Sequence, residues 1–270
     1  MGCQSRAAAT LPASPSTRER IARAFARSAH SYDQHADLQR AVADQLLALL
    51  PPQFAGAHVL DLGCGTGYCT RQLRALLPAS VVLALDLAEP MLQRARAIPS
   101  VLPLCADAQQ LPLQTASIDL LLSSLTIQWC DDLNALFAEL QRVLRNDGVA
   151  LLSTLGPQSL CELRAAWTGI DRRMHSNRFT PLATIEQAAS ANGFTLSWTR
   201  EVRTRHYESL RMLAHELKGL GANAVLEQQA STVSPASFRA AEAAFASNRE
   251  AAGIPVQWEV FYLQLLREAS

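Results

Sequence analysis

The stretch "HVLDLGCGTGY" at residues 58–68 joins a short apolar run to three glycines at alternate positions, Gly63, Gly65 and Gly67. A strand that enters a glycine loop and then a helix usually brings backbone N–H groups against a nucleotide, where a Cβ would push the ligand away. The dinucleotide fingerprint needs another small residue three places after Gly65, and this chain has Tyr68 there. The spacing therefore favours a ligand without a pyrophosphate, whose amino-acid and ribose portions lie along the loop, over NAD.

Strand-like and helix-like segments alternate after this loop. Strands are predicted at residues 58–62, 80–86, 101–107, 117–124 and 149–155, and helices at residues 70–77, 90–97 and 132–145. Strands joined by crossover helices pair in parallel, and several of these strands are too apolar to have a solvated face. The sequence thus predicts an α/β fold with a doubly wound, mostly parallel sheet that helices cover on both sides.

The rest of the chain divides around this sheet. Apolar residues at helical spacing predict N-terminal helices over residues 18–50, after a disordered tail at residues 1–17 that is rich in Ala, Ser, Thr and Pro. The main domain is expected over residues 51–270, with a helical insertion at about residues 205–250. Further helices are expected at residues 158–169, 181–191, 209–218 and 234–250, and a last strand at residues 255–266.

Acidic residues lie in or at the ends of the first three predicted strands. Asp86 follows Gly67 by 19 residues, close to the ~20-residue spacing at which a carboxylate accepts ribose hydroxyls. Asp107 and Ala108 end the third strand, where they are placed to meet the amine and ring nitrogen of an adenine. Asp61, inside the first strand, is expected to support the loop. The alternative, in which Asp86 and Asp107 are polar turn residues, stays open at this point.

Composition narrows the class of protein. The 270 residues include 24 basic and 24 acidic side chains, and a net charge of zero argues against a nucleic-acid binder that works by bulk charge. Six scattered cysteines without a C-x-x-C pair indicate free thiols in a reducing cytoplasm and no metal site. No apolar run approaches the ~20 residues of a membrane span. We expect a cytoplasmic protein that binds neither nucleic acid nor a membrane.

Four segments, "VLDLGCGTG", "LALDLAEPMLQRAR", "CADAQQLPL" and "SIDLLLSSLTIQW", resemble in order the motifs of class I S-adenosylmethionine-dependent methyltransferases. Four segments together resemble the malonyl-[acyl-carrier-protein] O-methyltransferases of biotin synthesis: "SAHSYDQHADLQRAVADQLLALL", "SLTIQWCDDLNALFAELQRVLRNDGVALLSTLGPQSLCELRAAW", "HSNRFTP" and "LKGLGANAV". The resemblance runs from about residue 20 to the C-terminus. It implies a class I, Rossmann-like fold with N-terminal lid helices, and methyl transfer from S-adenosylmethionine to the free carboxylate of a malonyl thioester.

This resemblance also implies roles for individual residues. The cofactor would be S-adenosylmethionine without a metal, and Gly63, Gly65 and Gly67 would lie near its methionine part. Its other expected contacts are Asp61, Asp86, Leu87, Met91, Asp107 and Ala108, with Asp86 at the ribose, Met91 near the adenine, and Asp107 and the Ala108 backbone at the adenine edge.

The resemblance places the acceptor side on three other segments. Tyr32, as part of a lid, would orient the acceptor carboxylate through its hydroxyl, and Gln128 and Trp129 follow the fourth strand at the edge where methyl acceptors lie. A malonyl carboxylate needs a cation, for which His175 and Arg178 are the candidates. For Tyr32, Gln128, Trp129 and Arg178 a packing or surface role stays open.

An acyl carrier protein is small and acidic, so the implied partner, a malonyl carrier or malonyl-CoA, calls for a basic surface. Residues 18–40 and residues 200–218 each contain five basic and three acidic side chains, a modest excess that also fits solvated helix faces. Two other functions stay open: a methyltransferase for another small acid or a quinone precursor, and a non-catalytic S-adenosylmethionine-binding adaptor.

Overall fold

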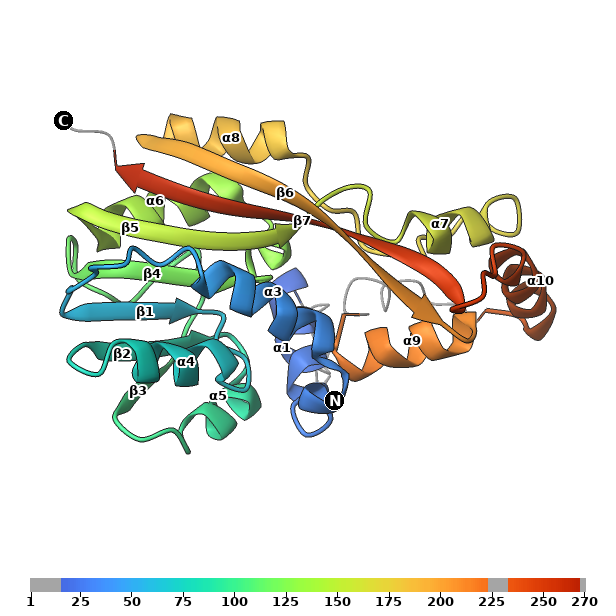
Figure 1. Cartoon of the computed structure of the whole chain (residues 1–270), viewed down its shortest axis with the longest axis horizontal. Helices are drawn as coiled ribbons and strands as arrows, with labels where there is room; N and C mark the ends of the chain where they lie inside the picture. Colours follow the sequence, from blue (N-terminus) through green and yellow to red (C-terminus); the bar gives the residue numbers. More distant parts are fainter. Residues whose placement is uncertain (1–15, 223–232, 268–270) are drawn as a thin grey trace, which may run out of the picture.

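The computed structural model of the chain describes residues 16–222 and 233–267. Its centre is a seven-stranded sheet of order β3-β2-β1-β4-β5-β7-β6 (Figure 1). The strands are β1 (His58–Leu62), β2 (Val81–Asp86), β3 (Val101–Cys105), β4 (Ile118–Ser124), β5 (Leu144–Leu155), β6 (Phe194–Tyr207) and β7 (Ile254–Arg267). Each neighbouring pair from β3 across to β5 is parallel, whereas β7 runs antiparallel to β5 and β6. The predicted mostly parallel, doubly wound sheet is confirmed.

Helices cover both faces of the sheet because its central strands bury side chains on both sides. Leu60 and Leu62 of β1 pack with α6 and α8 on one face, and Val59 packs with α3 and α4 on the other. Ala84 of β2 packs against α5 on this second face. The helices are α3 (Asp37–Leu47), α4 (Tyr68–Leu76), α5 (Glu89–Ala95), α6 (Leu133–Val143) and α8 (Leu182–Ala191).

The N-terminal segment forms three helices, α1 (Thr17–Ser28), α2 (Tyr32–His35) and α3. Ser16 and Glu19 form a capping box that satisfies free N–H groups at the start of α1, because the Glu19 N–H donates to the Ser16 hydroxyl and the Ser16 N–H to the Glu19 carboxylate. The helical region expected over residues 18–50 therefore begins at Thr17 and ends at Leu47. Residues 1–15 of the expected tail lie outside the described residues.

One strand escaped sequence prediction. No helix or strand is predicted for residues 194–204, and residues 205–207 fall at the start of the expected helical insertion, yet residues 194–207 form β6, which pairs with β7 along its whole length. Only its two end residues, Phe194 and Tyr207, are buried; the side chains between them are exposed or half-buried, and most of them are polar. An edge strand of this kind lacks the apolar run on which strand prediction depends, and its stability comes from the β7 ladder.

The long strands β6 and β7 extend beyond the rest of the sheet and carry α7 (Cys161–Trp167), α9 (Leu210–Gly219) and α10 (Pro235–Ala246) around their far end (Figure 1). Between these two strands the described residues form α9 and α10, where the sequence predicts its helical insertion. Because β6 continues to Tyr207, the helices begin later than the expected start near residue 205.

Candidate active site

A cavity, called here the active-site cavity, is lined by residues that follow β1, β2, β3 and β4 and by residues of α1 and α2. The strands position its floor, because parallel strands bring the residues that follow them to one edge of the sheet. Seven of the residues predicted to contact the cofactor line its wall, namely Gly63, Gly65, Asp86, Leu87, Met91, Asp107 and Ala108. The predicted acceptor-side residues Tyr32, Gln128, Trp129 and His175 line the same cavity.

Glycine occupies the three loop positions 63, 65 and 67 for different physical reasons. All three adopt positive φ. A Cβ on Gly63 would lie 2.1 Å from the Thr126 hydroxyl oxygen, and one on Gly67 would lie 2.6 Å from Ile98 Cδ1. Only at Gly65 would a Cβ meet nothing within 4 Å. The expectation that all three keep the backbone open to a ligand is thus corrected: Gly63 and Gly67 make room for the protein itself, and Gly65 faces open space.

Asp86 ends β2 with its carboxylate turned to the glycine loop. One carboxylate oxygen accepts the Gly65 N–H at 2.9 Å, and the other accepts the Ala88 N–H at 2.8 Å. Burial raises the pKa of Asp86, and these backbone hydrogen bonds oppose the rise. Each oxygen keeps a further acceptor position, which fits a pair of ribose hydroxyls.

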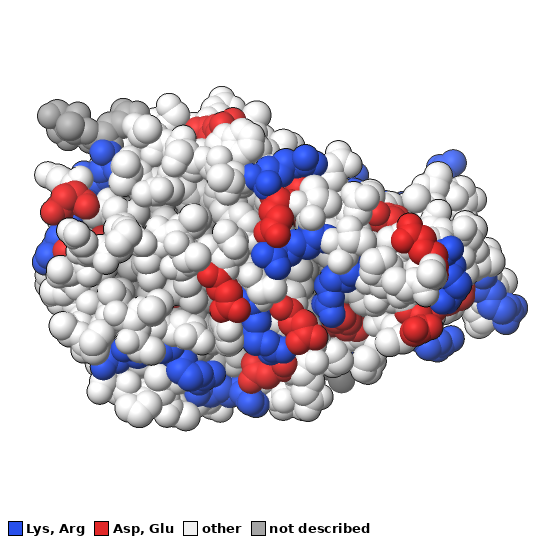
Figure 2. Space-filling view, in the orientation of Figure 1, with Lys and Arg blue, Asp and Glu red and all other residues white. Residues whose placement is uncertain are grey.

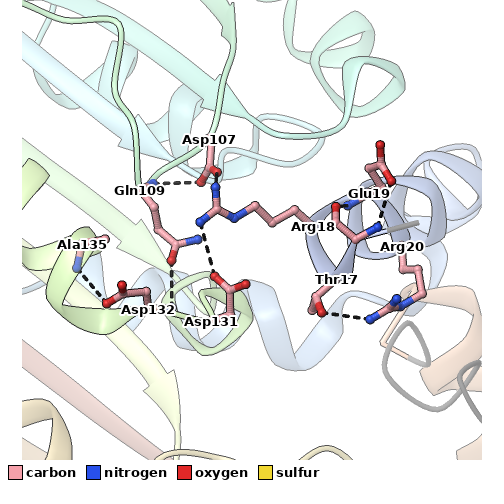
Figure 3. Close-up of polar contacts among 10 residues, drawn as sticks. Thr17, Arg18, Glu19, Arg20, Asp107, Gln109, Asp131, Asp132 and Ala135 are labelled. Atoms are coloured by element: carbon pink, nitrogen blue, oxygen red, sulfur yellow. Dashed lines mark hydrogen bonds and ion pairs between the residues drawn. The ribbon is translucent and has the colours of Figure 1, made fainter. Parts of the chain in front are cut away.

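Asp107 follows β3 and is held by a residue that sequence reasoning missed. Arg18 reaches from α1 across the cavity edge, with Nη1 2.5 Å from Asp107 Oδ2 and Nη2 3.5 Å from Asp131 Oδ1 (Figure 3). The other Asp107 oxygen accepts the Gln109 N–H at 2.9 Å. The Gln109 side chain in turn accepts the Asp132 N–H at 2.8 Å. The Arg18 guanidinium therefore connects α1 to the two loops that contain Asp107 and Asp131.

Two of the predicted cofactor residues do not line the active-site cavity. Asp61 is fully buried under the loop and accepts a hydrogen bond from the Thr70 hydroxyl of α4. Burial, partly offset by that bond, raises the pKa of Asp61 to about 7. Gly67 is the N-cap of α4 in the left-handed region. Both residues therefore act at the junction between the loop and α4. Asp61 was expected to support the loop, and it does so by binding Thr70 of α4, not the loop amides.

Tyr32 and Trp129 pack in two separate apolar clusters beside α1. Tyr32 packs against a small cluster that contains Met91, and its hydroxyl has a pKa raised by burial and, next, by the charge of Asp86. Trp129 meets Phe25 of α1 edge to face, with ring centroids 5.2 Å apart and an interplanar angle of 87°. The aromatic pair joins α1 to the short helix η1 (Ile127–Trp129) that follows β4.

Gln128 and His175 are both fixed by contacts to neighbouring elements. The Gln128 side-chain oxygen accepts the Leu155 N–H at the end of β5, at 3.0 Å. The His175 ring stacks on Trp167 with centroids 3.6 Å apart, and its Nε2 lies 2.7 Å from an Asp171 oxygen. These contacts pre-orient both side chains at the cavity wall.

The remaining prediction, Arg178, lies on the wall of a second cavity beside the first. Its neighbours Ser176 and Asn177 line both cavities and were not singled out as individual residues, although "HSNRFTP" contains them. Arg18 and Phe25 were missed because a charged and an apolar residue on an amphipathic helix look like an ordinary solvated and packed face.

The described residues give no sign of a metal centre or a membrane segment. No group of three or more His, Cys, Asp or Glu side chains among them is arranged to hold a metal ion. Across the same residues, no helix is long and apolar enough to cross a membrane.

Solved structures share this architecture. The YcgJ protein of Bacillus subtilis superposes with a TM-score of 0.59 at 19% identity, covering 85% of this chain and 99% of that one. A phosphoethanolamine N-methyltransferase of Haemonchus contortus, solved with S-adenosylhomocysteine, gives a TM-score of 0.59 at 18% identity over 96% of this chain and 62% of that one. Residues 60–152 match the methyltransferase domain family. Fold and site together define a class I, Rossmann-like methyltransferase.

Curated relatives define the family more narrowly. A malonyl-[acyl-carrier protein] O-methyltransferase of Dechloromonas aromatica is 37% identical over 92% of this chain and 94% of its own length. One from Serratia marcescens is 44% identical over 76% of this chain and 79% of its own length. The chain belongs to the malonyl-[acyl-carrier protein] O-methyltransferase family. It spans about half the length of other relatives, such as the biotin biosynthesis bifunctional protein BioHC of Cellvibrio japonicus, which is 40% identical over 93% of this chain and 50% of that protein.

Replacing Arg18 tests its role as the tie between α1 and the strand-end loops. Because its partly exposed ion pairs are each worth about 0.2–1 kcal/mol, Arg18→Gln should raise amide hydrogen exchange in residues 17–28 about two- to fivefold. Hydrogen exchange read by mass spectrometry measures this. Arg23→Gln, an exposed arginine on the same helix, is the matched control. Equal protection in wild type and Arg18→Gln would show that apolar packing alone holds the helix.

Proposed function

We propose that the protein transfers the methyl group of S-adenosylmethionine to the free carboxylate of malonyl-[acyl-carrier protein], which gives a malonyl methyl ester for biotin synthesis. One observation carries the proposal: the residues expected at the nucleoside and the family-specific "HSNRFTP" segment line a single cavity. The names of the relatives supply the acceptor, and the cytoplasmic location predicted from the scattered cysteines is part of the proposal.

The nucleoside end of the cavity suits the methyl donor. S-adenosylmethionine supplies an electrophilic methyl group on a sulfonium. Asp86 would accept the ribose hydroxyls, and the open face of Gly65 would take the methionine part. Met91 would pack near the adenine, and Asp107 with the Ala108 backbone would contact its edge. Asp107 forms an ion pair with Arg18, so only the lone pairs that this contact leaves free would accept a hydrogen bond from an adenine amine.

The proposed methyl transfer depends on how the carboxylate and the methyl group are positioned and needs no general base. A free carboxylate has a reference pKa near ~4, so it is already an anionic nucleophile at neutral pH. Well-oriented groups gain effective molarities of ~10⁵–10⁸ M when the reacting atoms are held ~3 Å apart and in line. The raised pKa of Tyr32 keeps its hydroxyl protonated, so this residue would donate a hydrogen bond that orients the acceptor.

The other acceptor-side residues would complete the cavity wall around the malonyl group. Since its oxygen is taken by the Leu155 N–H, Gln128 would present its amide nitrogen as a second donor. Trp129 and Phe25 would exclude water from the transfer. His175, held by Asp171 and Trp167, lines this cavity and would contact the malonyl carboxylate, whereas Arg178 lies one cavity further out.

The acceptor is tested with labelled S-adenosylmethionine and carrier protein that bears malonyl, succinyl or acetyl groups. Malonyl carrier should be methylated fastest, and acetyl carrier should be inert because it has no free carboxylate. Label transfer is measured after separation of the carrier. Methylation of a quinone precursor or another small acid in place of the malonyl carrier would favour the alternative acceptor, and no transfer to any of them would favour the adaptor.

Asp86 is the test of the nucleoside assignment. Loss of a charge-assisted hydrogen-bond acceptor costs about 1.5–3 kcal/mol, so Asp86→Ala should weaken S-adenosylmethionine binding about 10- to 150-fold. Titration calorimetry gives the dissociation constant. Asp147→Ala, an exposed aspartate far along the chain in the β5 segment, should bind as wild type does. Unchanged affinity in folded Asp86→Ala would rule out the ribose role.

Tyr32 is tested by removal of its hydroxyl alone. If the hydroxyl orients the acceptor in the transition state, Tyr32→Phe should lower kcat about tenfold and leave S-adenosylmethionine affinity as it is. Steady-state kinetics with malonyl carrier separates the two. Tyr68→Phe, which removes only a hydroxyl bonded to Asp44 outside the active-site cavity, serves as control. Wild-type turnover in Tyr32→Phe would leave Tyr32 with a packing role.

A further inference from the structure

A second cavity, called here the arginine cavity, opens beside the active-site cavity. Its wall includes Arg164 of α7 and the loop at residues 171–179. His175, Ser176, Asn177 and Phe179 line both cavities, so this loop is a shared wall. Nothing in the proposed methyl transfer uses the outer side of that wall.

Basic side chains outnumber acidic ones around the arginine cavity. Four arginines line it, namely Arg164, Arg172, Arg173 and Arg178, and its one acidic lining residue, Asp171, is paired with His175. Arg164 is fixed in place because its guanidinium donates to the carbonyls of Pro157 and Ser159. Arg172 and Arg178 are exposed, and within the described part of the chain neither makes an ion pair.

The basic face predicted over residues 200–218 is different. Arg200 pairs with Glu259 at 2.6 Å, and Arg205 pairs with Glu216 at 2.6 Å. Figure 2 shows basic and acidic side chains interleaved over the middle of the face on which β6, β7 and α9 lie in Figure 1. Paired charges of this kind attract an anion weakly, so the arginine cavity is the better anion site.

The shared wall also has buried polar atoms without partners. The Ser176 hydroxyl and the Asn177 side-chain oxygen are both shielded from solvent, and among the described residues neither has a hydrogen-bond partner. Ser176 is only 5% exposed. A buried polar group left unpaired is costly, and a ligand with amide groups would remove that cost.

We propose that the arginine cavity binds the phosphodiester of the carrier's phosphopantetheine arm. The arginines would bind the phosphate through pairs of guanidinium N–H groups. The amides of the arm would form hydrogen bonds with Ser176 and Asn177 where the arm passes into the active-site cavity. This inference rests on the proposed function, because it takes the acceptor to be a thioester on that arm. Its geometry is independent of the methyl donor.

The test compares malonyl-phosphopantetheine with malonyl-pantetheine, which differ only in the phosphate. Wild-type enzyme should prefer the phosphorylated substrate in kcat/KM. Removal of one charge-assisted contact should lower that preference about tenfold in Arg172→Gln and in Arg178→Gln. Arg239→Gln, an exposed arginine on α10 away from both cavities, is the matched control and should keep the wild-type preference.

Several outcomes would overturn the inference. If wild type shows no preference for the phosphate, the cavity has no role in holding it. If Arg178→Gln slows both substrates equally, Arg178 binds the malonyl carboxylate instead. If holo and apo carrier proteins compete equally and both arginine variants weaken that competition, the cavity docks the acidic protein surface and not the arm.

The same design separates this inference from the proposed function. Failure of wild-type enzyme to methylate either small substrate or the malonyl carrier contradicts the function. In that case, direct binding of fluorescent phosphopantetheine against pantetheine still decides whether the arginine cavity recognises the phosphate. Loss of that discrimination in Arg172→Gln supports the site, and equal binding of both probes overturns it.

Discussion

The site depends on how the chain leaves β1. The N–H groups of Gly63 and Cys64 both donate to the Leu85 carbonyl at the end of β2, at 2.7 and 2.9 Å. These two hydrogen bonds fix the direction in which the chain turns after β1. Only a glycine fits at position 63, because Thr126 occupies the space that a Cβ would need. Once the turn is fixed there, Gly65 meets the Asp86 carboxylate and its open side faces the cavity.

Two carboxylates hold this loop from opposite sides at a cost in solvation. Burial raises the pKa of both Asp61 and Asp86, and hydrogen bonds offset part of that rise. Asp61 joins β1 to α4 behind the loop, while Asp86 joins the loop to the start of α5 in front of it. The two aspartates thus connect the loop region to different helices, Asp61 to α4 and Asp86 to α5.

The cover of the cavity combines a packed contact with an electrostatic one. Phe25 meets Trp129 through aromatic edges, and Arg18 bridges to Asp107 and Asp131 beyond the strand ends. The aromatic contact is insensitive to salt, whereas partly exposed ion pairs weaken as salt rises. Of these two contacts, the Arg18 bridge is therefore the one that added salt weakens.

The sequence by itself determined the alternation of strands and helices, the glycine turn and Asp86 at the end of β2, because each depends on local spacing along a few residues. It missed β6, whose polar side chains leave no apolar pattern and whose partner β7 follows only after α9 and α10. Only the tertiary structure decided that Arg18 meets Asp107, that Gly67 makes room for Ile98, and that Arg178 lies outside the active-site cavity. Those contacts join residues distant in the chain, so their chemistry depends on a packing geometry that local spacing does not encode.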